Sequence, residues 1–277
     1  MRAPSFKRLA AFGAGIAAWE AVVHASLFLN RQSPRLFGIR LAPRLNAVQS
    51  IVPAIAALGL ARYALARDDR PPFAFRWIAR RVLGERLVDV PLDAVLADVD
   101  RHYGALVAGV VKAKTSAGRL NLRMAAYLVA LSRSLREIGM TDAEAHRALA
   151  DGLFAVMQRV WWAPDRLAAI VHPRDLAART RMRQRLGRRV YFRGPDWSMR
   201  EVHVDGGFGV DVDRCVMRDF LADLGELELC RDVLCAQDLW MAALRGERLL
   251  RTATLAEGAT HCDFRFVEPA SAPLVAL

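Results

Sequence analysis

The chain has 277 residues, 54% of them hydrophobic, and its 40 Lys and Arg against 29 Asp and Glu give a net charge of +11. This length is ample for one large domain or two modest ones, and the positive charge favours anionic partners. Four cysteines in so long a chain exclude a disulfide scaffold and indicate a reducing cytoplasm.

The first 70 residues predict a hydrophobic helical extension. Residues 9–29 are almost wholly apolar, and as a helix they could extend ~31 Å, about one hydrocarbon core. A second apolar run covers 46–66, although the basic loop before it opposes a membrane hairpin with cytoplasmic ends. Glu20 and His24 share a helix face, which suits a polar seam better than half of a metal site. A single span, a monotopic hairpin and a soluble helix pair stay open, and we expect this extension to attach the chain to the cytoplasmic membrane.

The run Asp68-Asp69-Arg70-Pro71-Pro72 marks a domain boundary, because charges followed by paired prolines end a helix. We expect residues 71–277 to form one domain, helical at first and α+β later. Helical periodicity predicts its first three helices, over residues 73–83, 91–114 and 120–138.

Two further helices are predicted in the middle of the chain. Thr141-x-x-Glu144 is a capping box, in which each side chain satisfies the other residue's backbone N–H, and it opens a helix through Trp161. Pro164 should begin the next helix, which His172-Pro173 ends.

Residues 174–193 contain eight arginines and a single acid, Asp175. Such a run could contact nucleic acid or anionic lipid, or it could be a solvated helix face. No nucleic-acid-binding motif and little aromatic interleaving accompany it. The solvated face is therefore favoured, followed by a lipid headgroup contact, and nucleic acid is not expected as a partner.

From Val190 onward the hydrophobic period changes from 3.6 to 2. Asp205-Gly206-Gly207 separates two alternating stretches, which is a strong hairpin signal. Helices over 215–224 and 230–244 and strands over 247–257 and 261–267 should follow. The predicted fold is α+β, with a helical N-terminal region and a C-terminal, mostly antiparallel sheet of about four strands packed with helices.

All four cysteines lie in the last quarter of the chain, and three of them have an acid nearby. A carboxylate beside a thiol raises the pKa of that thiol, so these pairs do not by themselves make thiolate nucleophiles. Acid–base chemistry by the aspartates, with the cysteines lining the site or attacking, is the more coherent interpretation. The pairs are Cys215 with Asp219, Cys235 with Asp238, and Cys262 with Asp263.

Two other interpretations of the cysteines stay open. Cys215, Cys235 and Cys262, with Asp238 or His261 as a fourth ligand, could hold zinc, although no Cys-x2-Cys pair supports this. They could also be small buried hydrophobes in a tight core. The fourth cysteine, Cys230, receives no role.

Three stretches carry a family resemblance: Asp213-Arg214-Cys215-x3-Asp219-Phe220-x4-Gly225, Cys235-x2-Asp238, and Thr254-Leu255-x2-Gly258-x3-Cys262-Asp263-Phe264-Arg265-Phe266. Their order and spacing resemble the L-2-aminothiazoline-4-carboxylate hydrolase family over residues 200–267. The chain departs from the family pattern at Val216, where a proline is usual. The resemblance does not cover the hydrophobic extension.

The resemblance implies a cofactor-independent hydrolase that opens a small sulfur–nitrogen heterocycle. Water would attack the amidine-like carbon of an aminothiazoline carboxylate, and the ring C–S bond would break to give an N-carbamoyl cysteine. Arg214 or Arg265 would bind the substrate carboxylate. The catalytic set would come from Cys215, Asp219, Cys235, Asp238, Cys262 and Asp263.

The alternative function is a non-enzymatic domain that binds a small molecule or lipid. The layout is similar to vinyl-reductase-like sensor modules, some of which hold zinc through cysteines. A narrow polar pocket beside Asp219, Asp238 and Cys262 favours hydrolysis, whereas a long apolar one favours ligand storage. Both functions have a small-molecule partner, and neither requires a cofactor.

Overall fold

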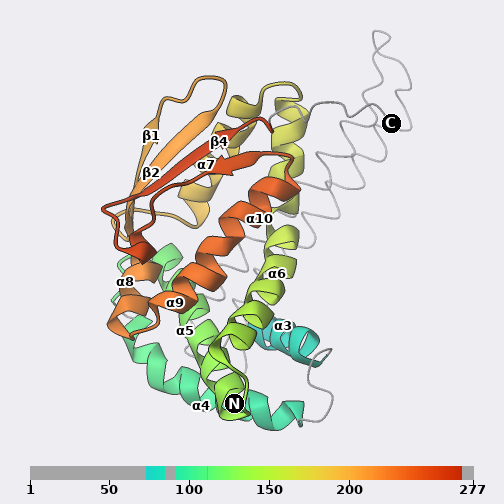
Figure 1. Cartoon of the computed structure of the whole chain (residues 1–277), viewed down its shortest axis with the longest axis vertical. Helices are drawn as coiled ribbons and strands as arrows, with labels where there is room; N and C mark the ends of the chain where they lie inside the picture. The colour runs from blue at the N-terminus through green and yellow to red at the C-terminus, as the bar shows by residue number, and fades with distance from the viewer. Residues whose placement is uncertain (1–72, 85–90, 111, 270–277) are drawn as a thin grey trace, which may run out of the picture. The chain divides into compact units, whose positions relative to one another are not determined.

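The computed structural model describes residues 73–84, 91–110 and 112–269, all within the unit Gly59–Leu277. The predicted α+β class is confirmed, with helices first and the sheet near the C-terminus. Figure 1 shows the elements in order: α3 (Phe73–Gly84), α4 (Leu92–Val110), α5 (Ser116–Glu137), α6 (Asp142–Val171), α7 (Leu176–Val190), β1 (Trp197–Val202), β2 (Phe208–Cys215), α8 (Val216–Asp223), α9 (Leu227–Leu229), the π-helix η1 (Cys230–Cys235), α10 (Ala236–Leu244), β3 (Arg248–Leu250), the 3-10 helix η2 (Leu255–Glu257) and β4 (Cys262–Val267).

The helical part of the core is organised around α5. This helix contacts α4, α6 and α8, and most of its residues between Ala117 and Leu135 are buried, as expected for a helix enclosed by neighbours. Thr115 caps it, because its hydroxyl oxygen accepts the N–H of Gly118 at 2.9 Å. The carboxylate of Asp196, which precedes β1, accepts the N–H of Thr115 at 2.7 Å. The start of the sheet is thus tied to the start of α5.

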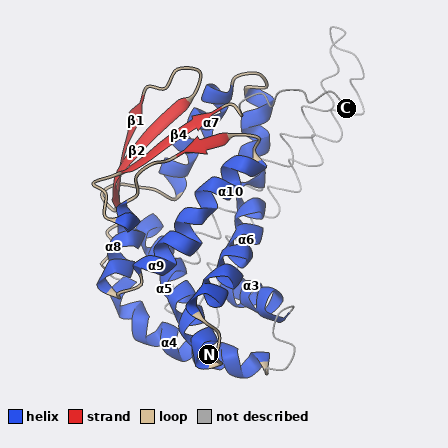
Figure 2. Ribbon diagram, viewed as in Figure 1, coloured by secondary structure: helices blue, strands red, loops and turns tan. Residues whose placement is uncertain are grey.

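The sheet has four antiparallel strands in the order β1-β2-β4-β3 (Figure 2). The hairpin predicted at Asp205-Gly206-Gly207 is confirmed, and it joins β1 to β2. Gly206 has φ of 65°, a conformation that favours glycine. Gly207 lies so close to the carbonyl of Phe266 that a Cβ would not fit. A second hydrophobic cluster packs the sheet against Ala242 of α10, through Phe208, Val210, Leu249 and Phe266.

The predicted break at Pro164 is wrong, because α6 runs through this residue as one 30-residue helix. A proline inside a helix removes one backbone hydrogen bond and strains the turn before it. Contacts on both sides offset that cost. Trp161 packs against Arg245 with 5.6 Å between guanidinium carbon and ring centroid, and Asp165 pairs with the same arginine at 3.0 Å. The capping box at Thr141 and Glu144 is confirmed.

The strand predicted over 247–257 ends at Leu250. Beyond it, the N–H groups of Thr252 and Ala253 donate to the carboxylate of Asp263 at 2.9 and 2.7 Å. These donors are therefore satisfied by a side chain instead of a strand ladder, and the chain turns into η2.

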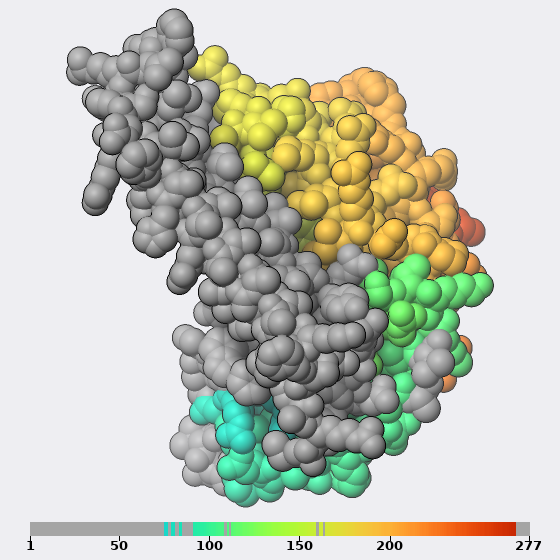
Figure 3. Space-filling model, turned by 180° about the vertical axis from the view of Figure 1, so that it is seen from behind, coloured from blue at the N-terminus to red at the C-terminus, as the bar shows by residue number. Residues whose placement is uncertain are grey.

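The arginine-rich stretch 174–193 contains α7, which lies on the surface drawn in yellow to gold in Figure 3. Asp175 caps this helix by accepting the N–H of Ala178 at 2.8 Å. Arg183 is buried, whereas Arg185, Arg188 and Arg189 are exposed. These exposures fit the solvated helix face that the sequence favours.

The apolar runs 9–29 and 46–66, and with them Glu20 and His24, lie outside the described residues. Within the described ranges, no helix combines the length and apolarity needed to cross a membrane. The membrane attachment of residues 1–70 stays a prediction.

Candidate active site

The antiparallel pairing of β2 with β4 places Val212, near the end of β2, opposite Cys262 at the start of β4. Each of the two thiols there accepts a backbone N–H. The Cys215 sulfur accepts the N–H of Arg218 at 3.5 Å, at the N-terminus of α8. The Cys262 sulfur accepts the N–H of Leu255 at 3.2 Å. Arg218 Nε donates to the carbonyl of Leu255 at 3.1 Å. Arg218 and Leu255 therefore link the surroundings of the two thiols.

The other two cysteines are the first and last residues of the π-helix η1. A π-helix widens the turn, so residues five apart come onto one face, and such turns are frequent at functional sites. The hydrogen bond between the Cys230 and Cys235 side chains is the first cause of the raised pKa of Cys230, followed by burial and by nearby Cys215 and Cys262. We call Cys215, Cys230, Cys235 and Cys262 the thiol cluster.

Three thiols of this cluster, those of Cys215, Cys230 and Cys262, have a raised pKa and are held in their uncharged form. Burial raises the pKa of Cys215, with Cys235 and Cys262 adding to the shift. Burial also raises the pKa of Cys262 to about 11, against the opposing effects of the Leu255 N–H and Arg251. A thiol is nucleophilic only as the thiolate. Cys215 and Cys262 are therefore poor nucleophiles at neutral pH.

Asp238, on the first turn of α10, is the acid that belongs to the cluster. Burial raises the pKa of its carboxyl group to about 6, and the positive charges of Arg251 and Arg245 limit the rise. Its side chain nevertheless keeps 43% of its exposure, so a carboxyl group surrounded by protein remains open to water or a ligand. A pKa near the working pH is what general acid–base catalysis requires.

Arg251 is the residue that the sequence analysis missed. Its Nη1 donates to the carbonyl oxygen of Cys235 at 3.0 Å and lies 3.3 Å from Asp238 Oδ2. Its guanidinium carbon is 5.7 Å from the ring centroid of Phe264, and only 11% of its side chain is exposed. One signal could have found it. In the predicted strand, Arg251 stands two residues after the apolar Leu249, on the same inward face.

Strand alternation separates two of the other predicted residues, Asp263 and Arg265, from the thiol cluster. Consecutive residues of a strand point to opposite faces, so Asp263 and Arg265 of β4 lie on the face opposite Cys262. Asp263 clamps the turn after β3, and although burial opposes its ionisation, hydrogen bonds from Thr252 and Ala253 lower its pKa.

The two predicted carboxylate-binding arginines have other contacts. Arg265 pairs with the buried Asp211 at 2.8 Å. Arg214 is exposed and donates to the carbonyl of Pro195 at 3.4 Å. Asp219 is also half exposed, at 51% of its side chain, and pairs with Arg218 at 3.3 Å. The structure therefore groups Cys215, Cys235, Cys262 and Asp238, and gives the other four predicted residues separate partners.

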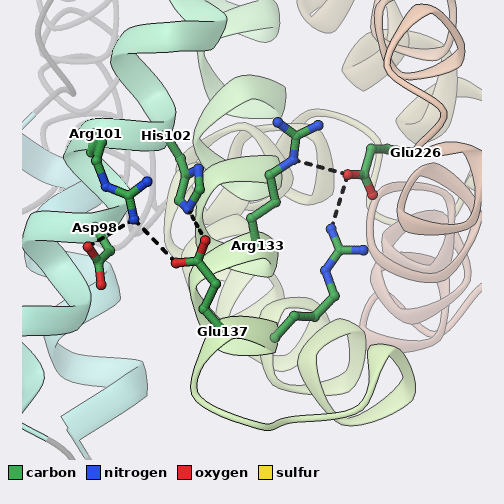
Figure 4. Close-up of polar contacts among 7 residues, drawn as sticks. Asp98, Arg101, His102, Arg133, Glu137 and Glu226 are labelled. Carbon is green, nitrogen blue, oxygen red and sulfur yellow. Dashed lines mark hydrogen bonds and ion pairs between the residues drawn. The ribbon is translucent and has the colours of Figure 1, made fainter.

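The turn between α8 and α9 is fixed to α5 by one carboxylate. Glu226 accepts from Arg133 Nε at 3.3 Å and from Arg136 Nη2 at 3.0 Å. Figure 4 shows the contact between Arg133 and Glu226, and also a separate group in which Glu137 is hydrogen-bonded to the His102 ring. Further along, buried His146 of α6 lies 3.0 Å from Asp232 of η1. Both contacts hold the helices that carry the cysteines against the helical core.

The described part of the chain contains no group of three or more His, Cys, Asp or Glu side chains arranged to hold a metal ion. A pocket of about 410 Å³ lies elsewhere, at the start of α7 and the β1–β2 turn, lined by Arg174, Asp175, Leu176, Ala177, Gly206, Gly207 and Glu268. None of the predicted site residues lines it.

Asp238 and the largely buried Arg251 lie beside Cys235, where the helices meet the antiparallel sheet of the α+β fold. The family described as L-2-amino-thiazoline-4-carboxylic acid hydrolase matches residues 122–266, which is 145 of 277 residues. The chain belongs to this family. The matched span includes the thiol cluster, Asp238 and Arg251. No curated protein and no solved structure matches the chain.

Proposed function

We propose that the chain is a hydrolase that opens a 2-aminothiazoline-4-carboxylate ring or a closely related cyclic amidine. Membership of the family supports hydrolysis. The single observation that carries the site assignment is the position of Asp238, whose pKa is raised to about 6 and whose carboxylate faces Arg251.

In the proposed reaction, the Asp238 carboxylate takes a proton from water, and the water oxygen forms a bond to the ring carbon between nitrogen and sulfur. As this bond forms, the electron pair of the ring C=N bond moves onto the ring nitrogen. The pair then re-forms the C=N bond while the bond from this carbon to the ring sulfur breaks, and the proton passes from Asp238 to the departing sulfur. The remaining O–H proton moves to the former ring nitrogen, so one water is added and an N-carbamoyl cysteine results. General acid–base catalysis of this kind contributes about 10²- to 10⁴-fold in rate.

The thiol cluster has a supporting role in this proposal. Burial keeps Cys215 and Cys262 protonated, so they line the site as small polarisable groups and do not attack the substrate. Water activation by Asp238 is preferred to a covalent isothiourea intermediate on a cysteine for that reason.

The test is a comparison of two aspartate substitutions. Asp238→Asn should lower kcat for ring opening by about 10²- to 10⁴-fold, while thermal unfolding changes little because the side chain is partly exposed. Asp223→Asn is the matched control on α8, since Asp223 is 62% exposed and pairs only with exposed Lys112 among the described residues. Equal activity of the two variants would refute the role of Asp238.

We also propose that residues 1–70 attach the protein to the cytoplasmic membrane, on the strength of the apolar runs 9–29 and 46–66. Full-length protein should sediment with membranes and resist extraction by salt, but dissolve in detergent. Recovery of the whole protein in the soluble fraction without detergent would contradict this proposal.

A further inference from the structure

A hydrolase that acts on a carboxylated ring needs a cation to hold the carboxylate, and the described cations beside Asp238 are Arg245 and Arg251. Arg245 pairs with Asp165 at 3.0 Å and lies over the ring of Trp161. Arg265, which the sequence suggested, is paired with Asp211 at 2.8 Å. Among the described residues, Arg251 is hydrogen-bonded through one guanidinium nitrogen.

All hydrogen bonds that Arg251 makes within the described residues use a single nitrogen. Nη1 serves both the carbonyl oxygen of Cys235 and Asp238 Oδ2. Nε and Nη2 have no hydrogen-bond partner among the described residues, and neither belongs to the buried polar atoms that lack one. Within the described ranges, the two nitrogens that form the other edge of the guanidinium fork are therefore unpaired and are not counted among the fully buried atoms.

That free edge has the geometry that carboxylates use. A guanidinium group presents two parallel N–H donors, which bind the two oxygens of a carboxylate together, and lysine cannot reproduce this arrangement. The face of the same guanidinium already rests on Phe264, at 5.7 Å, and its Nη1 is fixed at both acceptors. The fork is thus held in one orientation before any ligand arrives.

We propose that Arg251 is the carboxylate-binding residue of this site, and that its Nε–Nη2 edge selects small heterocycles that carry a carboxylate next to the ring. This inference rests on the proposed function, because it places the substrate carboxylate beside the base Asp238. It assigns to Arg251 the role that the sequence suggested for Arg214 or Arg265.

The arrangement links binding to catalysis. Arg251 lowers the pKa of Asp238 by its positive charge, and a bound carboxylate offsets part of that charge. Substrate binding therefore raises the proton affinity of Asp238 from its free value of about 6 toward neutrality. A base of this strength both accepts a proton from water and returns it to the leaving sulfur.

The experiment compares wild type, Arg251→Gln and Arg251→Lys on two substrates, 2-aminothiazoline-4-carboxylate and its carboxamide, which lacks the carboxylate charge. Loss of charge-assisted hydrogen bonds should cost Arg251→Gln about 10- to 150-fold in kcat/KM on the carboxylate, mainly through KM. Assayed at a pH above the Asp238 inflection of both enzymes, the carboxamide should lose less than about 3-fold, and Arg251→Lys should recover part of the carboxylate preference. Arg248→Gln, at an exposed position three residues earlier in β3, is the control and should match wild type.

A parallel loss on both substrates would overturn the inference and make Arg251 a positioning residue for Asp238. Binding of thiazolidine-4-carboxylate, measured by calorimetry, separates this inference from the proposed function. If wild type hydrolyses neither substrate but binds this compound, and Arg251→Gln does not, carboxylate recognition stands and ring hydrolysis fails. Absence of binding to folded wild-type protein would overturn the carboxylate site itself.

Discussion

Two arginines of this fold, the buried Arg183 and the partly buried Arg251, contact carboxylates in different ways. Arg183 has 6% of its side chain exposed and lies against Glu247, which is 1% exposed, with Asp165 at 3.6 Å. It also donates to Thr180 at 2.8 Å. Arg251 is nearly as buried, but its contacts involve one nitrogen and an aspartate that keeps 43% of its exposure.

The pair of Arg183 with Glu247 is buried on both sides, whereas the pair of Arg251 with Asp238 has one partner exposed. Burial lowers the pKa of Arg183, and Glu247 opposes that change, so each charge of this pair depends on the other being present. Breaking such a pair leaves an uncompensated buried charge. In the pair of Arg251 with Asp238, the Nε and Nη2 donors of Arg251 have no partner among the described residues, and the Asp238 side chain is 43% exposed. The first arrangement stabilises the fold, and the second can receive a ligand.

The largest effect on stability should come from breaking the buried pair of Arg183 with Glu247. Glu247→Gln leaves the Arg183 charge without its partner, so we expect a loss of about 3–5 kcal/mol in unfolding free energy, measured by urea or thermal unfolding. Activity per folded molecule should be retained. Glu201→Gln is the control, because its pair with Arg181 is exposed on both sides and should contribute only about 0–1 kcal/mol. Equal destabilisation by the two substitutions would remove the distinction.

The next effect concerns the alkylation rate of the thiols near Arg251 and Asp238. With its pKa raised to about 11, Cys262 should react with iodoacetamide at pH 7 roughly 100-fold more slowly than glutathione, because so little thiolate is present. Residue-resolved mass spectrometry gives the rate for each cysteine, and Cys215 should be similarly slow. Fast alkylation of either residue with parallel loss of activity would favour a covalent cysteine mechanism over water activation.

Much of the fold could be predicted from local chemistry. The Asp205-Gly206-Gly207 turn requires glycine at Gly206, and the capping box at Thr141 uses only neighbours in sequence, so both were accessible without tertiary information. The α+β class followed from the change in hydrophobic period. The continuation of α6 through Pro164 was not accessible, because contacts from α7 and α10 decide it.

The site was less predictable, since pairing an acid with its neighbouring cysteine ignores side-chain direction. Asp263 follows Cys262 directly, and strand alternation therefore turns it to the opposite face. Asp238 lies near the thiols of Cys230 and Cys235 because all three residues belong to the η1–α10 segment. Arg251 comes from another strand and reaches Cys235 and Asp238 only after folding. The spacing of residues along the sequence does not indicate such contacts between distant segments.

The proposal that Asp238 and Arg251 form the reacting centre is tested most sharply by the pH profile of kcat/KM for the carboxamide substrate, which lacks the carboxylate charge. This parameter reports groups of the free enzyme. Because Asp238 must be ionised to act as a base, wild-type kcat/KM should rise with pH through an inflection near its pKa of about 6.

Arg251→Gln should move this inflection to higher pH, since removal of the positive charge disfavours the carboxylate. Any titration of the substrate itself is common to both enzymes, so the displacement isolates the coupling between Arg251 and Asp238. We therefore expect the inflection of Arg251→Gln at a higher pH than that of wild type. The same inflection in both enzymes, or none near pH 6 in wild type, would contradict it.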